Sequence, residues 1–214
     1  MRAAQPNIST LNASKRLWLG ALAIFAAGVA NTQPVSPRAE APNIKVGDRW
    51  KTEQKDRRTG VKELETARSI TAVVASQLEG LENDGKLLMT SELALIESPT
   101  VVITGDAKVL NFPLEVGKKW DYQYSLRNKV TGVSSRLQLE SSVIGYEKVK
   151  VPAGEFDAFR IQAKGFWNND STGRNGRLQT THWYAPAARS IVKTEYEDGF
   201  NNWIRELTEL QLQP

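Results

Sequence analysis

Alternation of apolar and polar residues with a period of two constrains this chain more than any other feature. In residues 120–126, Trp120, Tyr122, Tyr124 and Leu126 fall on one face, with polar residues between them. Shorter segments in the second half repeat this spacing. A strand with one buried face produces the pattern, whereas an amphipathic helix repeats every 3.6 residues. The sequence therefore predicts an all-β body.

Turn signals separate these segments at short intervals. Asp84-Gly85, between the apolar runs 70–74 and 87–96, is a strong cue for a hairpin. Pro152 and Gly154 supply the fixed φ and the positive φ that a tight turn uses. Strands joined by hairpins predict an antiparallel curved sheet, either a half-barrel or barrel-like.

The C-terminal residues 203–213 fit two patterns. Ile204, Leu207 and Leu210 are spaced as on a helix, while Ile204, Thr208, Leu210 and Leu212 fit one face of a strand. We favour the strand, because almost no helical periodicity occurs elsewhere after the first thirty residues.

One short sequence occurs twice. VGDRW at residues 46–50 and VGKKW at 116–120 are near copies, and Thr-Gly-Val follows each of them, at 59–61 and 131–133. Each copy predicts a glycine turn, a strand that begins with Trp, a hairpin near Thr-Gly and a return strand. The alternative is a chance similarity between two hairpins. We expect two related hairpin units.

The N-terminal residues have the pattern of an export signal. Lys15 and Arg16 precede an apolar run, 17–29, and the small residue Ala30 suits cleavage by a signal peptidase. The run is short for a membrane span, which needs roughly 20 apolar residues. We expect a signal peptide at 1–30 and a periplasmic or secreted location, with an uncleaved anchor as the alternative.

The rest of the chain divides in two. Residues 31–42 contain three prolines and no periodic pattern, so they are expected to form a flexible linker. Residues 43–214 are expected to form a single β domain with sub-units 43–110 and 111–214. No cysteine is present, which excludes a disulfide and a lipid attached to cysteine.

The charge balance indicates no nucleic-acid partner. Three of the 28 Lys and Arg residues, Arg2, Lys15 and Arg16, lie in the predicted signal, which leaves 25 against 24 Asp and Glu. A nucleic-acid-binding surface requires a clear basic surplus.

Three motifs follow one another in the second half of the chain. They are FPLEVGKKWDYQY at 112–124, VKVPAGEFDAFRI at 149–161 and HWYAPAARSIVKTE at 182–195. In this order they resemble a family of exported bacterial proteins of unknown function, which carry G-K-x-W, V-P-A-G-x-F and W-Y-A-P motifs. The resemblance implies a curved antiparallel sheet and no catalytic residues. The chain departs from the family after Pro186, where a glycine would be commoner than the sequence Ala-Ala-Arg-Ser.

His182 is the only histidine and the best single candidate for catalysis. A serine hydrolase needs a base held against the nucleophile and a third group that orients the base, and no nucleophile motif occurs here. One histidine without cysteine also makes a poor zinc site. We expect no catalytic residue, metal or cofactor, with an envelope hydrolase that uses His182 as the alternative.

Aromatic residues gather in the second half. A curved sheet lined by rings can hold an apolar or amphiphilic ligand, such as a lipid, or an envelope component. The alternative is that the same rings fill the core. A further alternative is a scaffold that pairs an exposed strand edge with another envelope protein. The residues predicted to contact a ligand are Trp120, Tyr122, Tyr124, Phe159, Trp167, Trp183 and Tyr184.

Overall fold

A computed structural model describes residues 37–214 and confirms the all-β prediction. The predicted signal peptide, residues 1–30, lies outside the described residues. Within residues 37–214 the chain forms fourteen strands and one turn of 3-10 helix, η1 (Pro186–Ala188). No helix in this part of the chain has the length and apolar composition needed to cross a membrane.

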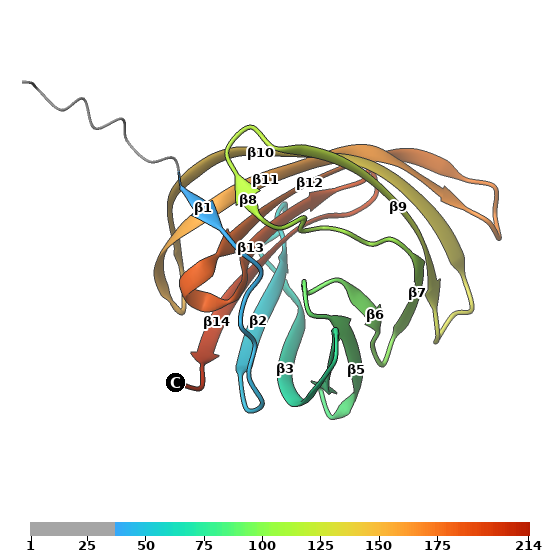
Figure 1. Cartoon of the computed structure of the whole chain (residues 1–214). Coiled ribbons are helices and arrows are strands. Elements are labelled where there is room, and N and C mark those ends of the chain that lie inside the picture. The colour runs from blue at the N-terminus through green and yellow to red at the C-terminus, as the bar shows by residue number, and fades with distance from the viewer. Residues whose placement is uncertain (1–36) are drawn as a thin grey trace, which may run out of the picture. The chain divides into compact units, whose positions relative to one another are not determined.

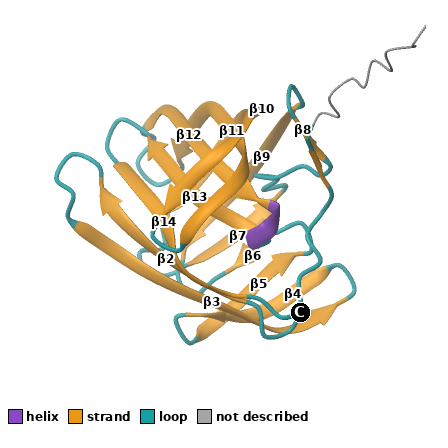
Figure 2. Cartoon of the chain, turned by 90° about the vertical axis from the view of Figure 1, so that its left-hand side faces the viewer, coloured by secondary structure: helices purple, strands orange, loops and turns teal. Residues whose placement is uncertain are grey.

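Twelve strands close into one antiparallel barrel, so the barrel-like alternative is the one observed (Figures 1 and 2). In spatial order they are β10 (Ser134–Val151), β11 (Gly154–Asn169), β12 (Asn175–Ala185), β13 (Ser190–Glu197), β14 (Asn202–Gln211), β2 (Arg49–Asp56), β3 (Lys62–Val74), β4 (Gln77–Glu82), β5 (Gly85–Thr90), β6 (Leu95–Glu97), β7 (Val101–Gly105) and β9 (Lys119–Asn128). Two short strands, β1 (Arg38–Ala39) and β8 (Leu114–Glu115), form a separate two-stranded sheet.

The C-terminal strand β14 closes the ring by pairing with β2. The predicted strand at residues 203–213 is thus confirmed, but its alternation differs from the predicted one. Trp203 and Arg205 line the interior, and Ile204 occupies the other face. A register shift between Leu207 and Glu209 inserts an extra residue, which changes the face on which later residues fall.

The repeated pentapeptide forms the same structure twice. The N–H of Gly47 donates to the carbonyl of Ile70, and the N–H of Gly117 donates to that of Val143, both at 2.8 Å. The two glycines have φ values of +94° and +93°, a region that favours glycine. The repeat therefore sets an identical entry turn into β2 and into β9, as predicted.

The hairpin turns that follow these strands are also alike. The side-chain oxygen of Asp56 accepts backbone N–H bonds from the residues two and three positions later, at 2.8 and 2.7 Å, and Asn128 does the same at 2.8 and 2.9 Å. Asn169, between β11 and β12, forms a third such turn, at 3.0 and 2.9 Å. In each turn a Thr-Gly pair begins three residues after the Asp or Asn. The repeated sequence marks the first two of these turns, and a polar loop between two strands is also predicted at 168–176.

The hairpin at Asp84-Gly85 exists, but the prediction omitted a strand. The turn is formed by Asn83 and Asp84, with φ values of +47° and +66°, and it joins β4 to β5. The apolar run 70–74 instead pairs with β4, through a turn at Ala75 with φ of +52°. Ala75 is not a usual turn residue and a single Ser at position 76 is only a weak turn signal, so this hairpin was not recognised from the sequence.

The packed body begins earlier than residue 43. Residues 38–39, predicted as part of a flexible linker, form β1 and pair with β8. The side chain of Ala39 is buried against the fully buried Leu114, and Arg38 forms an ion pair with Glu115. These contacts offset the entropy of ordering the segment, which composition alone did not indicate.

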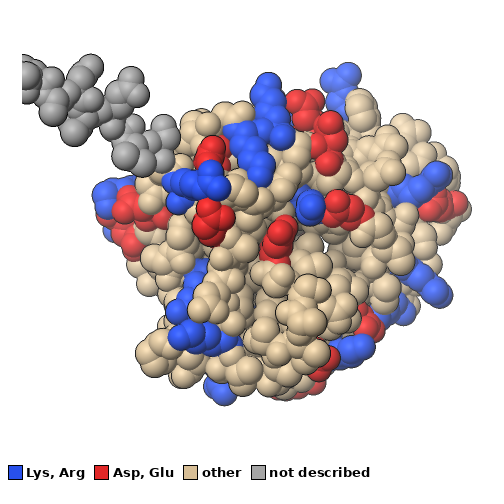
Figure 3. Space-filling model, viewed as in Figure 1, with Lys and Arg blue, Asp and Glu red and all other residues tan. Residues whose placement is uncertain are grey.

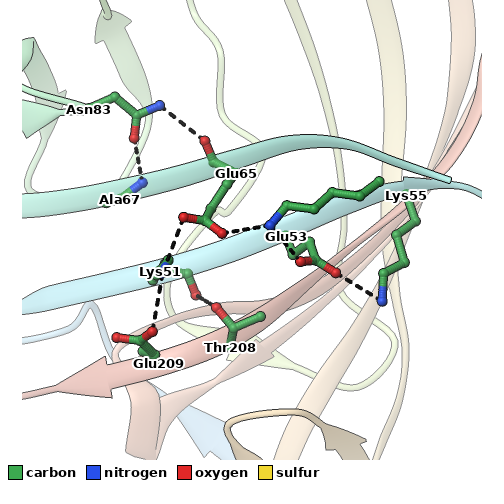
Figure 4. Close-up of polar contacts among 9 residues, drawn as sticks. Lys51, Glu53, Lys55, Glu65, Ala67, Asn83, Thr208 and Glu209 are labelled. Carbon is green, nitrogen blue, oxygen red and sulfur yellow. Dashed lines mark hydrogen bonds and ion pairs between the residues drawn. The ribbon is translucent and has the colours of Figure 1, made fainter.

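A ladder of alternating charges covers the outer face of β2, β3 and β14 (Figure 4). In order it consists of Glu209, Lys51, Glu65, Lys62, Glu53 and Lys55, with N to O distances of 2.7 to 3.3 Å. Hydrogen bonds from Lys62 and Lys55 lower the pKa of Glu53 to about 2. Acidic and basic side chains are also interspersed on the face drawn in Figure 3. Solvent and salt screen such pairs, so we expect them to contribute more to the solubility of the protein than to its stability.

Asp48, in the repeated pentapeptide, is fully buried beside the junction of β14 and β2. Its carboxylate accepts hydrogen bonds from the backbone N–H groups of Lys45 at 3.0 Å and Gln213 at 2.7 Å. The guanidinium of Arg189, which follows η1, donates to both carboxylate oxygens at 3.0 and 3.3 Å. One side chain therefore ties together the segment before β2, the segment after β14 and the turn after η1.

Replacing Asp48 should destabilise the barrel strongly. We expect Asp48→Ala to lower the free energy of unfolding by about 3 kcal/mol, because Arg189 loses its buried partner and two backbone N–H groups lose their acceptor. Urea unfolding followed by circular dichroism measures this change. The exposed Asp121 offers a matched control, for which Asp121→Ala should change the same quantity by less than about 0.5 kcal/mol. Equal effects of the two substitutions would contradict the role given to Asp48.

Candidate functional site

Six of the seven predicted ligand-contact residues lie together in one cluster inside the barrel. Trp120, Tyr122, Phe159 and Tyr184 are buried, and Tyr124 and Trp167 are partly buried against them. They come from β9, β11 and β12; β9 and β11 pair with β10, and β12 is the next strand after β11. The sequence pattern thus placed these rings on one inner surface correctly.

These rings pack against one another. Tyr122 and Tyr124 are stacked with ring centroids 6.2 Å apart, and Tyr184 meets Phe112 edge to face at 5.2 Å. The indole N–H of Trp120 donates to the carbonyl of Lys108 at 2.7 Å. None of the seven lines the interior cavity described below. This side of the barrel is a packed core, and contact of these rings with a ligand stays a prediction.

Trp183 is the exception among the seven. It lies on the opposite face of β12 from His182 and Tyr184 and is buried with Val149 and Val151 near the end of the β10–β11 hairpin. Its indole N–H donates to Glu147 at 2.8 Å, and the ammonium of Lys193 lies 4.6 Å from the ring centroid. The structure therefore does not bring Trp183 to the other six rings.

The other half of the interior contains a cavity of about 240 Å³. Its apolar lining comes mainly from β2, β3, β5, β13 and β14 and from two loops. The apolar residues are Trp50, Ile70, Leu87, Met89, Leu93, Leu95, Val109, Ile191, Val192 and Trp203. Barrels with many strands are too wide for side chains to fill completely, which explains why space is left here.

Leu93, Val109 and Ile191 connect this cavity to the aromatic cluster. All three line the cavity and also pack against the buried rings. The rings therefore support one wall of the cavity from behind. This arrangement gives the aromatic residues a role in shaping the cavity.

The cavity also has cationic groups in its lining, and three of them, Arg68, Arg189 and Lys193, form ion pairs with carboxylates. Arg68 forms hydrogen bonds to Glu82 at 2.8 and 2.7 Å, and Arg189 is held by Asp48 as described above. Arg189 has φ of +50° in the turn where the resembling family favours glycine. The ion pair with Asp48 holds this side chain at a position that is strained for most residues.

Arg205, on β14, has no carboxylate partner among the described residues. Its Nη2 donates to Oε1 of Gln54 at 2.6 Å, and its guanidinium carbon lies 5.0 Å from the ring centroid of Trp203. Its Nε–H is buried and makes no hydrogen bond within residues 37–214. Burial, and secondly the charge of Arg68, lower the pKa of Arg205 to about 10, so the group stays cationic at neutral pH.

His182 lines the same cavity from β12. Its Nδ1 lies 3.1 Å from Oγ1 of Thr194, and its Nε2 lies 3.3 Å from Oγ1 of Thr180. Burial, and secondly the charge of Arg205, lower the pKa of His182 to about 4. The described part of the chain places no carboxylate in hydrogen-bonding contact with this ring, so the orienting group of a hydrolytic triad is missing.

A metal site finds no support in the described residues. No group of three or more Asp, Glu or His side chains lies close enough together in residues 37–214 to hold an ion.

Sequence reasoning singled out His182 but missed two arginines of the cavity lining, Arg68 and Arg205. Arg205 lies between Trp203 and Leu207 on one face of an alternating segment, and Arg68 lies between Thr66 and Ile70 in the same way. A charged residue at a position where alternation predicts an inward side chain is a signal that could have identified both. Neither arginine belongs to a motif, so only the alternation marks them.

Comparison of the chain with known proteins yields matches in structure only. No protein-family model and no curated protein matches the sequence. A "putative exported protein with YmcC-like fold" from Bacteroides fragilis NCTC 9343 superposes with a TM-score of 0.56 at 13% identity, covering 81% of this chain and 99% of that one. A "putative lipoprotein" from Parabacteroides distasonis ATCC 8503 has a TM-score of 0.55 at 14% identity, covering 84% and 100%. These likenesses show that the chain shares its fold with both proteins.

The depressed pKa of His182 should make stability dependent on pH. A histidine in the unfolded chain has a pKa of about 6.5, so as the pH falls the unfolded state takes up a proton before the folded state does. Stability should therefore be lost between about pH 6.5 and pH 4, with about 2 kcal/mol lost by pH 5. His182→Gln should remove this part of the dependence in urea unfolding at pH 7.5 and 5. Because the chain has one histidine, an unchanged dependence in the variant would contradict this assignment.

Proposed function

We propose that this protein is exported to the periplasm or secreted, and that it binds an apolar or amphiphilic small molecule inside its barrel without catalysing a reaction. The observation that carries this proposal is the cavity on the β2, β3 and β14 side of the interior. It combines a largely apolar lining with a few polar groups, which is typical of sites for small molecules.

The size of the cavity limits what it can hold. An apolar cavity of about 150 Å³ accommodates benzene, and this one measures about 240 Å³. It is smaller than the 300 Å³ or more that is usual for drug-sized ligands. A short chain or a single ring therefore fits better than a complete diacyl lipid. A larger envelope component would have to insert only one of its chains.

The packed aromatic half of the barrel supports the same function indirectly. Interiors are close-packed, so the ring cluster resists collapse of the wall that it supports. The six predicted rings are then structural supports of the site, and direct contact with ligand would require movement of Leu93, Val109 or Ile191. This proposal moves ligand contact from the predicted rings to the residues that line the cavity.

The two alternatives from the sequence are less well supported. A hydrolase that uses His182 would need an orienting acid, and the imidazole contacts two threonine hydroxyls instead. A strand-pairing scaffold needs an exposed edge, and each of the twelve barrel strands has a neighbour on both sides. Within residues 37–214, edges remain only in the small β1–β8 sheet.

The export part of the proposal rests on the apolar segment 17–29 and the preceding Lys15 and Arg16. The two proteins of the same fold are described as exported and as a lipoprotein, which agrees with this proposal. Export would place the barrel where it meets lipids and their breakdown products.

Binding inside the cavity can be tested with a variant that fills it. Thr52 lines the cavity, and Thr52→Phe should weaken binding of a short-chain amphiphile by about tenfold, because the added ring takes up space that the ligand needs and overpacking costs about 1–3 kcal/mol. Calorimetric titration measures the affinity, and mass spectrometry of organic extracts identifies molecules that copurify. Thr71→Phe, at an exposed position outside the cavity lining, serves as the control. No bound molecule and no response to any added amphiphile would refute the binding function.

Export can be tested independently of binding. We expect cell fractionation to place the wild-type protein in the periplasm or the medium. N-terminal sequencing of that product should begin at Asn31. Leu22→Arg should retain the full-length chain inside the cell, because a charge in the apolar run prevents its recognition as a signal. Asn12→Arg, which lies before the run, should be exported normally. Export of both variants to the same extent would contradict the assignment of the signal.

A further inference from the structure

On the basis of the proposed function, we propose that the ligand is a single-chain amphiphile with one carboxylate, and that Arg205 binds its head group. The ligand class follows from three features of the described residues. They are the charge balance of the cavity, the unused donor of Arg205 and the apolar lining next to it.

The charge balance leaves one positive charge without a partner. Arg68, Arg189 and Lys193 line the cavity and form ion pairs with Glu82, Asp48 and Glu195, the last at 3.0 Å. His182 is neutral at pH 7 because its pKa is lowered to about 4. Arg205 is therefore the one uncompensated cation of this lining within residues 37–214. A ligand with a single negative charge makes the cavity neutral, whereas a dianionic phosphate monoester would give it a net negative charge.

The guanidinium of Arg205 is held in position to receive such a group. The hydrogen bond to Gln54 and the contact with the ring of Trp203 fix its orientation from two sides. The buried Nε–H has no partner among the described residues. A planar guanidinium binds a carboxylate through two parallel N–H bonds, and a free Nε–H together with a neighbouring Nη–H supplies that pair. A buried donor without an acceptor is costly, so a carboxylate there is favoured.

Apolar side chains next to Arg205 suit the rest of the ligand. Trp50, Ile70, Leu87 and Met89 line the same cavity from β2, β3 and β5. Their surfaces can cover a short hydrocarbon chain once its head group is held by Arg205. Burial of each methylene contributes about 0.8 kcal/mol, which favours a chain over a small hydrophilic acid such as acetate.

Three probes with the same chain and different head groups test the charge preference. Decanoate, decanol and decylamine are titrated into the full chain at pH 7.5, below the micelle-forming concentration of each, and calorimetry measures the dissociation constants. We expect decanoate to bind at least tenfold more tightly than decanol, because hydrogen bonds to charged groups exceed neutral ones by about that factor. Decylamine should bind more weakly than decanol.

Two arginine variants assign the preference to a residue. Arg205→Met should bind decanoate at least tenfold more weakly than the wild type and should no longer distinguish it from decanol. The matched control is Arg160→Met, because Arg160 also has a buried Nε–H without a partner but lies next to Trp183 on the opposite face from the cavity. Arg160→Met should keep the wild-type preference. If Arg205→Met fails to fold, the comparison of the three probes on the wild type still decides the charge preference.

The outcomes separate this inference from the proposed function. Equal binding of decanoate and decanol, or preferred binding of decylamine, would overturn the inference and leave the binding function intact. An unchanged preference in a folded Arg205→Met protein would overturn the role of Arg205. If none of the three probes binds and nothing copurifies, both the inference and the proposed binding function fail.

Discussion

The pairing of β14 with β2 is the constraint on which the rest of this structure depends. It joins the last long strand to the first one and so converts an antiparallel sheet into a ring of twelve strands. The buried carboxylate of Asp48 strengthens this junction, because it binds backbone on both sides and the guanidinium of Arg189. A ring of this size is wider than its own side chains can fill, so closure also creates the cavity.

The interior is divided between two kinds of packing. Rings from β9, β11 and β12 fill one side, and a cavity with mixed apolar and cationic lining occupies the side of β2, β3 and β14. Burial of an uncompensated guanidinium disfavours folding, and a well-packed apolar residue would avoid this cost. Arg205 is therefore better explained by binding than by stability, which is why it carries the inference on ligand class.

Short sequence motifs in this protein determine architecture more than chemistry. The Pro152–Gly154 turn carries Ala153, whose N–H donates to the carbonyl of Leu207 at 3.0 Å and so attaches the β10–β11 hairpin to β14. The two copies of the Gly-x-x-Trp sequence set the entry turns of β2 and β9. Of the charged groups that line the cavity, Arg189 and Lys193 lie in the third motif, but Arg68 and Arg205 belong to none. Motif resemblance therefore predicted the fold and marked only part of the cavity lining.

The sequence by itself determined the strands, most of the turns and the inward face of the aromatic segments, because alternation and turn chemistry are local. It did not determine the β3–β4 hairpin, whose Ala75 gives no turn signal, or the register shift at Thr208 that sets the faces of β14. Only the tertiary structure decided that the sheet closes and that Arg205, Trp203 and Trp50 line one cavity. These residues come from distant parts of the chain, and their proximity depends on strand pairing that local patterns do not specify.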